Sequence, residues 1–541
     1  MSDATQNTAR SPQTRPLGAQ ISHMLKERGV DVIFGIPGVH NQEMYRGIEE
    51  AGITHVLARH EQGAGFMADG YARATGKPGV AYVITGPGLC NIMTPMGQAY
   101  SDSVPMLVMS SCLDETAAQR GQLHQMKDQE IAAGTVCDWS ETALSAQATY
   151  NLIDRALGEF QTARPRPKHI QVPIGQLEAL APPPPRRFDA PLGATCADAS
   201  TGIARDWHSL LSKAKYPLFI FGGGARHAAA PARSLMKRTG AAAFTTYAGR
   251  GILPSDEPLN FGSFLARPDS VTVIQKADLI IAVGTELAEV DLWRLRLGHD
   301  CPMIRVDIDP EVLRDQHRAE VQVLGDAHCF LDNLLEEMSQ DLTHAWTAAE
   351  VSAARRRWRA EVEAEYAGIP EICDALRACL PEKTLIYSDM TQFAYAAKEV
   401  WYMDRPGHWH HPYGFGTLGY ALPAAIGGAV GQPDQTTLAI IGDYGFHYTM
   451  AELGVAVELG LSLPIILWDN GKLGAIEASM VSAQIAPNAV IARNPDFCKL
   501  AQAFGAGSAA PKTLAEMQDA VRAAFDADGP TLIYVTPDIK A

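Results

Sequence analysis

The stretch between residues 438 and 472 constrains the fold more than any other, because it indicates a strand, a helix and a second strand in succession. Leu438–Ile441 has the composition of a buried parallel strand, and Pro464–Trp468 is a second apolar run after an amphipathic helical pattern. The strands of such a unit run parallel, so Asp443 and Asn470, which follow them, emerge at one carboxyl edge of a sheet. Carboxylate, amide and backbone carbonyl oxygens suit Mg²⁺ that holds a phosphate. We therefore predict a cation and phosphate site at this edge.

Strands alternate with helices along the rest of the chain, which predicts an α/β protein with parallel, doubly wound sheets. A chain of 541 residues is too long for one core, and the strand pattern indicates three Rossmann-like domains. Four consecutive prolines after Ala181 mark the clearest boundary. The predicted parts are a disordered tail (1–16), an N-terminal domain (17–180), a Pro-rich linker (181–200), a central domain (201–335), a solvated connecting helix (336–368) and a C-terminal domain (369–541).

Composition excludes several classes of protein. Hydrophobic residues make up 47% and charged residues 20%, which is a globular balance. The net charge of −16 argues against binding to nucleic acid or to an acidic membrane surface. The polar N-terminus lacks the apolar segment of a signal peptide, and no apolar run reaches the roughly 20 residues that span a bilayer. Nine scattered cysteines without close pairs indicate reduced thiols, so we expect a cytoplasmic protein.

Two further stretches agree with the first. Arg59–Arg73 opens a predicted helix in which Glu61 is surrounded by small residues, and Tyr413–Ala425 is a Gly-rich segment between predicted strands. Together with Gly442–Lys472, they resemble the glutamate, cofactor-supporting and metal–diphosphate motifs of thiamine-diphosphate enzymes of the acetolactate synthase and 2-oxo acid decarboxylase family. The resemblance covers nearly the whole chain. It implies a pyrimidine-binding domain, a central domain and a diphosphate-binding domain, in that order.

The resemblance implies thiamine diphosphate and Mg²⁺ as cofactors. Glu61 would hydrogen-bond the aminopyrimidine ring and promote loss of the thiazolium proton, and Leu418 would hold the two rings in a bent shape. Mg²⁺ would bind Asp443, Asn470 and the carbonyl of Lys472. Taken singly, Glu61 also fits a partner for a helix dipole, and Leu418 also fits a core residue. The implied cofactor-binding residues are Gly35, Pro37, Gly38, Glu61, Pro87, Asn91, Gly416, Leu418, Gly442, Asp443, Tyr444, Gly445 and Asn470.

One position departs from the family pattern. Tyr444 stands where the family usually has a small residue, so we expect a backbone contact with phosphate there and leave a side-chain contact open. The family also implies a homodimer or homotetramer in which the glutamate and the metal site of each active site come from different subunits.

Two reactions remain open, namely non-oxidative decarboxylation of a 2-oxo acid and acetolactate synthesis by carboligation. Ser479 stands where synthases usually carry a tryptophan, and Gly121–Gln129 departs from the synthase pattern. Phe34–His40 and Trp468–Gly474 are similar to decarboxylases of 5-guanidino-2-oxopentanoate, which we favour. Glu477 would donate a proton or pair with a cationic substrate tail, although a solvated helix residue also fits.

Histidines and the central domain complete the predictions. We propose His124 and His411 as catalytic proton carriers, and give less weight to His40, His60 and His410. The Gly222–Gly224 turn is not a Gly-x-Gly-x-x-Gly fingerprint, so FAD is left open without being favoured. A non-catalytic, flavin-binding relative is a third hypothesis, and the intact acidic motifs argue against it.

Overall fold

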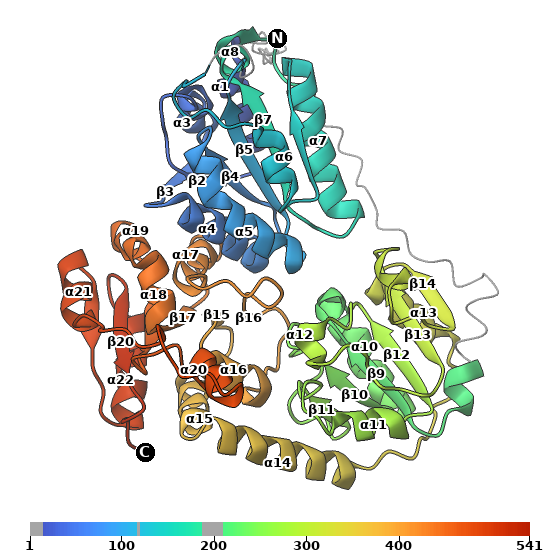
Figure 1. Ribbon diagram of the computed structural model, residues 1–541. Helices are drawn as coiled ribbons and strands as arrows, with labels where there is room; N and C mark the ends of the chain where they lie inside the picture. The colour runs from blue at the N-terminus through green and yellow to red at the C-terminus, as the bar shows by residue number, and fades with distance from the viewer. Residues whose placement is uncertain (1–13, 116–119, 187–208) are drawn as a thin grey trace, which may run out of the picture. The chain divides into compact units, whose positions relative to one another are not determined.

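A computed structural model describes residues 14–115, 120–186 and 209–541 (Figure 1). The chain forms two compact units. One holds residues 14–186 apart from two short segments (73–75 and 162–164), and the other holds those segments with the described residues from 209 onward. Most of the predicted tail and linker lies outside the described residues. Arg15 and Pro16, which the tail was expected to include, instead form strand β1 (Arg15–Pro16), which pairs antiparallel with β8 (Leu180–Ala181).

The first unit is built on a six-stranded parallel sheet in the order β3-β2-β4-β5-β7-β6. Its central strands are buried throughout, as expected for apolar strands covered on both faces. The strand order reverses between β2 and β4, so the carboxyl ends of these strands flank a topological switch point. The strands are β2 (Val32–Gly35), β3 (Thr54–Leu57), β4 (Gly79–Val83), β5 (Met106–Cys112), β6 (Trp139–Thr142) and β7 (Lys168–Pro173). The helices are α1 (Leu17–Glu27), α2 (Gln42–Arg46), α3 (Ile48–Ala51), α4 (Glu61–Thr75), α5 (Pro87–Ser101), α6 (Gln129–Gly134), α7 (Ala146–Thr162) and α8 (Ile174–Glu178).

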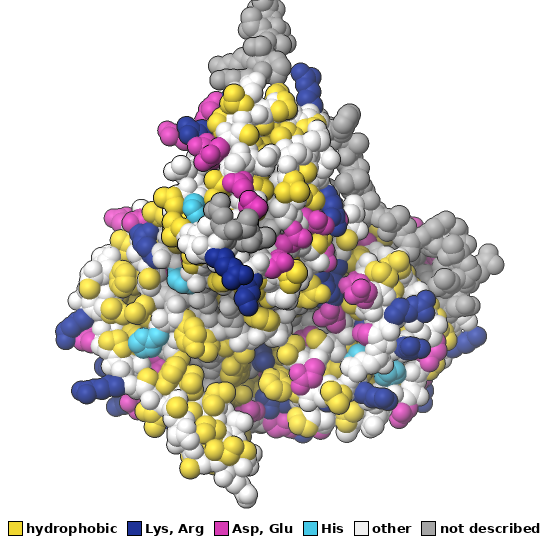
Figure 2. All heavy atoms as spheres, turned by 45° about the horizontal axis from the view of Figure 1, so that its top comes forward, with side chains coloured by type: hydrophobic (Ala, Val, Ile, Leu, Met, Phe, Trp, Pro, Cys, Tyr) yellow, Lys and Arg dark blue, Asp and Glu magenta, His cyan; other side chains and the backbone are white. Residues whose placement is uncertain are grey.

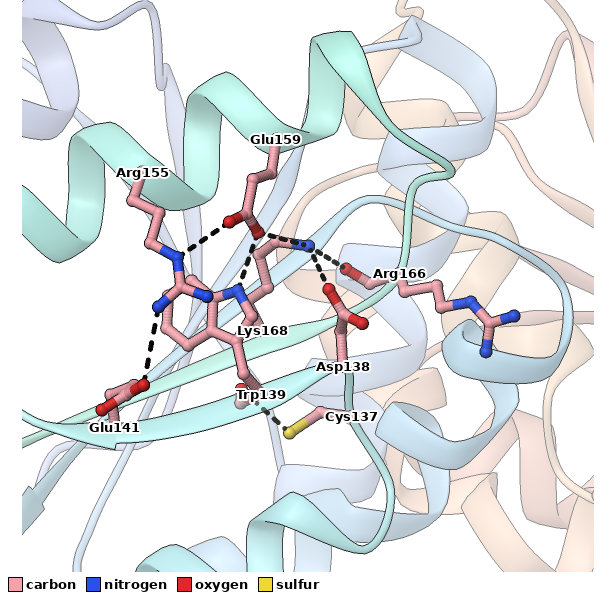
Figure 3. Close-up of polar contacts among 8 residues, drawn as sticks. All are labelled: Cys137, Asp138, Trp139, Glu141, Arg155, Glu159, Arg166 and Lys168. Carbon is pink, nitrogen blue, oxygen red and sulfur yellow. Dashed lines mark hydrogen bonds and ion pairs between the residues drawn. The ribbon is translucent and has the colours of Figure 1, made fainter. Parts of the chain in front are cut away.

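A buried ionic cluster joins α7 to the amino ends of β6 and β7 (Figure 3). Lys168 is only 1% exposed, and its Nζ lies 3.0 Å from Asp138 Oδ2 and 3.3 Å from Glu159 Oε2. Trp139 Nε1 donates to Glu159, and the Arg155 guanidinium lies 4.4 Å from the centre of the Trp139 ring. A buried ammonium is tolerated only when it is paired. The cluster lies at the edge opposite the strand carboxyl ends, away from the candidate site residues.

The central domain has a second six-stranded parallel sheet in the order β11-β10-β9-β12-β13-β14. Gly222 follows β9 and Gly284 follows β12, at the switch point of this sheet. A Cβ on Gly222 would lie 2.2 Å from the Gly284 carbonyl oxygen, so these glycines are needed where the two turns pack against each other. The strands are β9 (Pro217–Phe221), β10 (Ala242–Thr245), β11 (Asn260–Gly262), β12 (Leu279–Val283), β13 (Met303–Asp307) and β14 (Val321–Leu324). The helices are η1 (Gly223–Ala228), α10 (Ala229–Thr239), α11 (Ser270–Lys276), α12 (Glu289–Leu292), η2 (Val312–Arg314) and α13 (Ala327–Glu337).

The C-terminal domain contains the third parallel sheet, in the order β16-β15-β17-β18-β20-β19. Gly442 at the end of β17 lies opposite Trp468 at the end of β18, as the parallel strand–helix–strand unit predicts. The strands are β15 (Leu385–Ser388), β16 (Trp409–His410), β17 (Thr437–Gly442), β18 (Pro464–Trp468), β19 (Gly507–Ala509) and β20 (Thr531–Val535). The helices are α15 (Ile369–Cys379), α16 (Gln392–Val400), α17 (Ala421–Gly431), α18 (Asp443–Thr449), η3 (Met450–Glu452), α19 (Leu453–Glu458), α20 (Gly474–Ser482), α21 (Phe497–Phe504) and α22 (Leu514–Phe525).

The connecting helix α14 (Ala348–Glu365) is not solvated all round, so that expectation was wrong for one of its faces. Trp358 on this face is fully buried, and its ring centre lies 5.5 to 6.0 Å from those of Phe244, Phe261 and Phe264. The same apolar cluster continues into α15, α16 and the C-terminal sheet. The helix therefore helps to join the central and C-terminal domains into one unit.

The prediction of three parallel, doubly wound sheets is confirmed. Numbered by their order in the chain, the strands of the N-terminal sheet and of the C-terminal sheet follow the same spatial order, 2-1-3-4-6-5. The central sheet follows the order 3-2-1-4-5-6 of dinucleotide-binding folds. Acidic and basic side chains are scattered among hydrophobic ones over the face in Figure 2. Among the residues that the structure describes, none of the helices combines the length and the apolar character needed to cross a membrane.

The cysteines differ in part from the expectation of reduced thiols. Free thiols are found at Cys90, Cys112, Cys137, Cys301, Cys373, Cys379 and Cys498. Cys329, by contrast, is disulfide-bonded, so the expectation was wrong for this residue. The cytoplasmic location stays a prediction.

Candidate active site

Glu61 lies at the carboxyl edge of the N-terminal sheet, where it begins α4. The helix is capped by His60, whose Nδ1 accepts a hydrogen bond from the Gln62 backbone N–H. Glu61 is 8% exposed, and its Oε2 accepts a 2.9 Å hydrogen bond from Asn91 Nδ2 on α5. A Cβ on Gly88 would lie 3.3 Å from Glu61 Oε1, so that glycine leaves room for the carboxylate. The fold thus brings together Glu61 and Asn91, two residues predicted from the sequence.

The Gly35–Gly38 turn after β2 packs tightly against the end of β4. A Cβ on Gly35 would lie 2.2 Å from the Tyr82 carbonyl oxygen. The Gly38 backbone N–H donates a 2.7 Å hydrogen bond to the side chain of Asn41, which is buried. These glycines therefore fix the shape of the switch-point edge. Of the two prolines predicted to contact cofactor, Pro37 is exposed on the turn after β2 and Pro87 is exposed at the start of α5.

Gln129 anchors the turn that precedes α5, a role that the sequence did not reveal. Its Oε1 accepts a 2.9 Å hydrogen bond from the Gly86 N–H, and its Nε2 donates to the Ser111 carbonyl and the Ser110 hydroxyl. Ser110 Oγ also lies 2.8 Å from His169 Nε2. Burial lowers the pKa of His169 to about 3, so this histidine is neutral near pH 7. The Gly86 turn is therefore supported by a buried, uncharged network.

His124 is paired with His40 at the same edge. The two Nδ1 atoms lie 3.3 Å apart, and the rings meet edge to face with centres 4.9 Å apart. Burial, and then the nearby His124 ring, lower the pKa of His40. His124 has a left-handed backbone with φ of 62°, and a Cβ on Gly86 would lie 2.4 Å from its carbonyl oxygen. The loops after β2 and β5 thus present two imidazoles that can share one proton.

Asp443 is the first residue of α18 and lies at the carboxyl edge of the C-terminal sheet. The side-chain amide of Asn494 donates to Asp443 Oδ2 at 2.7 Å and to Asp469 Oδ1 at 2.8 Å. Burial, and then the neighbouring Asp469 carboxylate, raise the pKa of Asp443. Two carboxylates that share one amide carry an excess of negative charge, which a cation would balance. The sequence predicted Asp443 but missed Asp469 and Asn494.

Asn470 lies beside this acidic pair, after β18. Its Nδ2 donates a 2.8 Å hydrogen bond to Gln392 Oε1, and its Oδ1 accepts one from the Lys472 backbone N–H. Within the described residues, no group of three or more His, Cys, Asp or Glu side chains is arranged to hold a metal. A cation here would need amide and backbone oxygens as well as a carboxylate. That donor set fits a hard ion such as Mg²⁺.

Asp389 organises the segment that contains Gly416 and Leu418, although it was not predicted. It follows β15, is fully buried, and accepts hydrogen bonds from the backbone N–H groups of Met390, Gly419 and Ala421. Burial raises the pKa of Asp389 to about 6. Gly416 has φ of 66°, a conformation that favours glycine, and Leu418 is half-buried. An aspartate directly after a predicted strand at the same edge was the signal that could have found it.

The remaining predicted residues have contrasting surroundings. His411 is buried with Nδ1 2.9 Å from Ser388 Oγ, and burial holds its pKa well below the ordinary value. It is therefore uncharged at neutral pH. Glu477 lies on α20, where its Oε2 is 2.6 Å from Lys472 Nζ. Tyr444 is partly exposed on α18.

Three family models match the chain in the order of its domains. They describe the N-terminal TPP binding domain (residues 15–131), the central domain (205–334) and the C-terminal TPP binding domain (389–535) of thiamine pyrophosphate enzymes. The protein belongs to this family of thiamine pyrophosphate, or thiamine diphosphate, enzymes.

Individual relatives align along nearly the whole chain. The chain is 42% identical to the probable 2-ketoarginine decarboxylase AruI of Pseudomonas aeruginosa, over 96% of this chain and 94% of that protein. It is 27% identical to the large subunit of acetolactate synthase isozyme 1 of Escherichia coli, over 98% and 95% of the two chains. The mitochondrial catalytic subunit of acetolactate synthase from Saccharomyces cerevisiae is also 27% identical, over 97% and 81%.

Proposed function

We propose that the protein is a thiamine-diphosphate- and Mg²⁺-dependent decarboxylase of 5-guanidino-2-oxopentanoate, which is 2-ketoarginine. The observation that carries this proposal is the 42% identity with a probable 2-ketoarginine decarboxylase over nearly the full length of both chains. Two acetolactate synthases of Escherichia coli are 27% and 29% identical to the chain. Ser479, exposed on α20 in place of the tryptophan expected of synthases, agrees with the decarboxylase.

The carboxyl edges of the N-terminal and C-terminal sheets are proposed to bind different parts of the cofactor. Thiamine diphosphate, when bound, supplies the electron sink for decarboxylation. Glu61, held by Asn91, is proposed to hydrogen-bond the aminopyrimidine and to hold a proton there. Asp443, Asn470 and the Lys472 carbonyl are proposed to hold Mg²⁺ on the diphosphate, which the paired carboxylates at this edge support. The backbone contacts proposed for Gly442, Tyr444 and Gly445 complete the phosphate site.

Loss of CO₂ must be followed by delivery of a proton to the product. We assign this role to His124 together with His40, because their Nδ1 atoms lie close enough to share one proton. His411 is a poorer candidate, since burial keeps it uncharged at neutral pH. We assign it to supporting the cofactor-binding segment through Ser388 instead.

The active site is proposed to form between two copies of the chain, as a homodimer or within a homotetramer. Large apolar side chains are exposed at the carboxyl edge of the N-terminal sheet, at Val39, Leu57 and Leu123. Others are exposed around the metal edge of the C-terminal domain, at Phe415, Tyr448 and Ile476. Apolar surface of this kind at a polar site favours burial against another subunit. FAD is not part of the proposal, because the Gly222–Gly224 turn lacks the Gly-x-Gly-x-x-Gly fingerprint.

The test is CO₂ release from a panel of 2-oxo acids, with identification of the products. Purified protein with thiamine diphosphate and Mg²⁺ is expected to release CO₂ from 5-guanidino-2-oxopentanoate and to form the matching aldehyde. Acetolactate formed from pyruvate, without turnover of the guanidino compound, would overturn the proposal in favour of a synthase. The visible absorption spectrum of the same preparation reports any bound flavin.

A further inference from the structure

Glu477 is the residue that the sequence suggested for the cationic end of the substrate, and its carboxylate is already paired. Its Oε2 lies 2.6 Å from Lys472 Nζ, with 26% of the Glu477 side chain and 42% of the Lys472 side chain exposed. Within the described part of the chain, Lys472 is the only cation within ion-pairing distance of this carboxylate. The pair is therefore accessible to a ligand from solvent.

The fold turns Glu477 toward the proposed metal site. Gly474 begins α20, and a Cβ there would lie 2.8 Å from Gln392 Oε1 and 3.0 Å from Asn470 Nδ2. Glu477 lies three residues further along the helix and so shares the face of Gly474. The Lys472–Glu477 pair therefore lies on the face of α20 that is turned toward Asn470.

We propose that, in the free enzyme, the Lys472 ammonium occupies the subsite that binds the substrate guanidinium. The guanidinium then displaces the ammonium from Glu477 when the substrate binds. This inference rests on the proposed function. A guanidinium is a planar fork that bonds both oxygens of a carboxylate, whereas an ammonium on a flexible stem bonds as a point charge. The exchange keeps Glu477 neutralised in the free enzyme and in the complex. It moves only the Lys472 side chain, so the backbone carbonyl assigned to Mg²⁺ stays in place.

The exchange makes the enzyme selective for a cationic tail. A neutral 2-oxo acid leaves the Lys472–Glu477 pair intact and gains nothing from Glu477. The matched probe is 5-ureido-2-oxopentanoate, which has nearly the shape of the guanidino substrate and no charge. The difference between the two substrates isolates the contribution of Glu477.

The experiment compares KM and kcat for both substrates in Lys472→Met, Lys472→Gln and Glu477→Gln. Both Lys472 variants are expected to lower KM for the guanidino substrate by about three-fold to ten-fold, because they remove the ammonium that competes for Glu477. The size of the effect follows from the modest strength of a partly exposed ion pair. KM for the ureido substrate should not change. Glu477→Gln should raise KM for the guanidino substrate and bring the two substrates to nearly equal KM values. The double variant should match Glu477→Gln alone.

Lys499→Met is the control, because it removes a lysine from an exposed ion pair with Asp496 in the same unit. It should leave both KM values unchanged. An unchanged or higher KM for the guanidino substrate in the two Lys472 variants would overturn the inference, as would equal shifts for both substrates. Mg²⁺ affinity, measured by calorimetry, should not fall in Lys472→Met, because the backbone carbonyl is kept and a positive charge is removed; a loss of affinity would also count against the inference. If the wild-type enzyme does not decarboxylate the guanidino substrate, the proposed function itself is wrong. That result is obtained without any of the variants.

Discussion

The N-terminal and C-terminal sheets have the same strand order and place their candidate site residues at the same carboxyl edge, yet the two edges differ in charge. At the N-terminal edge, Glu61 is held by the amide of Asn91, beside a neutral network around Gln129. At the C-terminal edge, Asp443 and Asp469 share the amide of Asn494.

This contrast shows how one fold supports two kinds of chemistry. Strand order fixes where a ligand meets the sheet. The residues directly after the strands then fix what the edge can do. A single carboxylate among amides is suited to holding a proton, and paired carboxylates are suited to holding a cation.

Glu61→Gln should produce the largest effect, because it removes the carboxylate of the N-terminal edge and keeps its shape. We expect decarboxylation to fall by about 10²-fold to 10⁴-fold, the range for loss of a positioned acid or base. Mg²⁺ affinity should not change, since the proposed metal site lies at the other edge. Steady-state CO₂ release and calorimetry measure the two quantities. Glu49→Gln, an exposed glutamate in the same unit, is the control and should behave as the wild type.

Asp443→Asn should weaken Mg²⁺ binding by about ten-fold or more, because a charged oxygen ligand becomes neutral. Without Mg²⁺ the variant should melt at a higher temperature than the wild type, because the repulsion between the carboxylates of residue 443 and Asp469 is removed. Thermal melts with EDTA and with Mg²⁺ check both effects, and Asp434→Asn on an exposed loop serves as the control. A lower melting temperature in EDTA would show that the edge does not require a cation.

Gln129→Ala tests whether the neutral network supports the N-terminal edge. The substitution leaves the Gly86 N–H without its side-chain acceptor, so we expect a loss of about 1–3 kcal/mol in stability. Activity should fall about ten-fold while Mg²⁺ affinity is retained, as urea titration and CO₂ release would show. Gln42→Ala, at an exposed position of α2, should change neither. Equal losses in both variants would show that Gln129 has no specific role in supporting the N-terminal edge.

Acid should destabilise the N-terminal sheet through His169. Burial lowers the pKa of His169 in the folded protein to about 3, whereas an unfolded histidine titrates near 6.5. Below pH 6.5 the unfolded chain therefore binds the extra proton, and stability is lost as pH falls toward 3, by up to about 1.4 kcal/mol per pH unit. Hydrogen exchange of β7 between pH 7 and 5 measures the slope. His169→Gln should flatten it, and His328→Gln, in the other unit, should leave it as it is.

Local patterns predicted the strands and placed Glu61, Asp443 and Asn470 at the sheet edges, because each residue begins a helix or closely follows a strand with a clear period. They did not reveal Asn494, which is brought to Asp443 from 51 residues further along the chain. Gln129 was missed for the same reason, since its partner Gly86 is 43 residues away. The buried face of α14 was hidden because arginine and glutamate dominate that helix and mask a narrow apolar stripe around Trp358.

The two edges of one active site are proposed to come from different copies of the chain, and mixing two inactive variants tests this most directly. Glu61→Gln and Asp443→Ala are each expected to be nearly inactive alone. Mixed and allowed to exchange subunits, they should recover about a quarter of wild-type activity, since half of the random dimers then carry one intact site of two. Exchange is followed independently by native mass spectrometry. Mixed dimers that form and show no recovered activity would contradict the shared site.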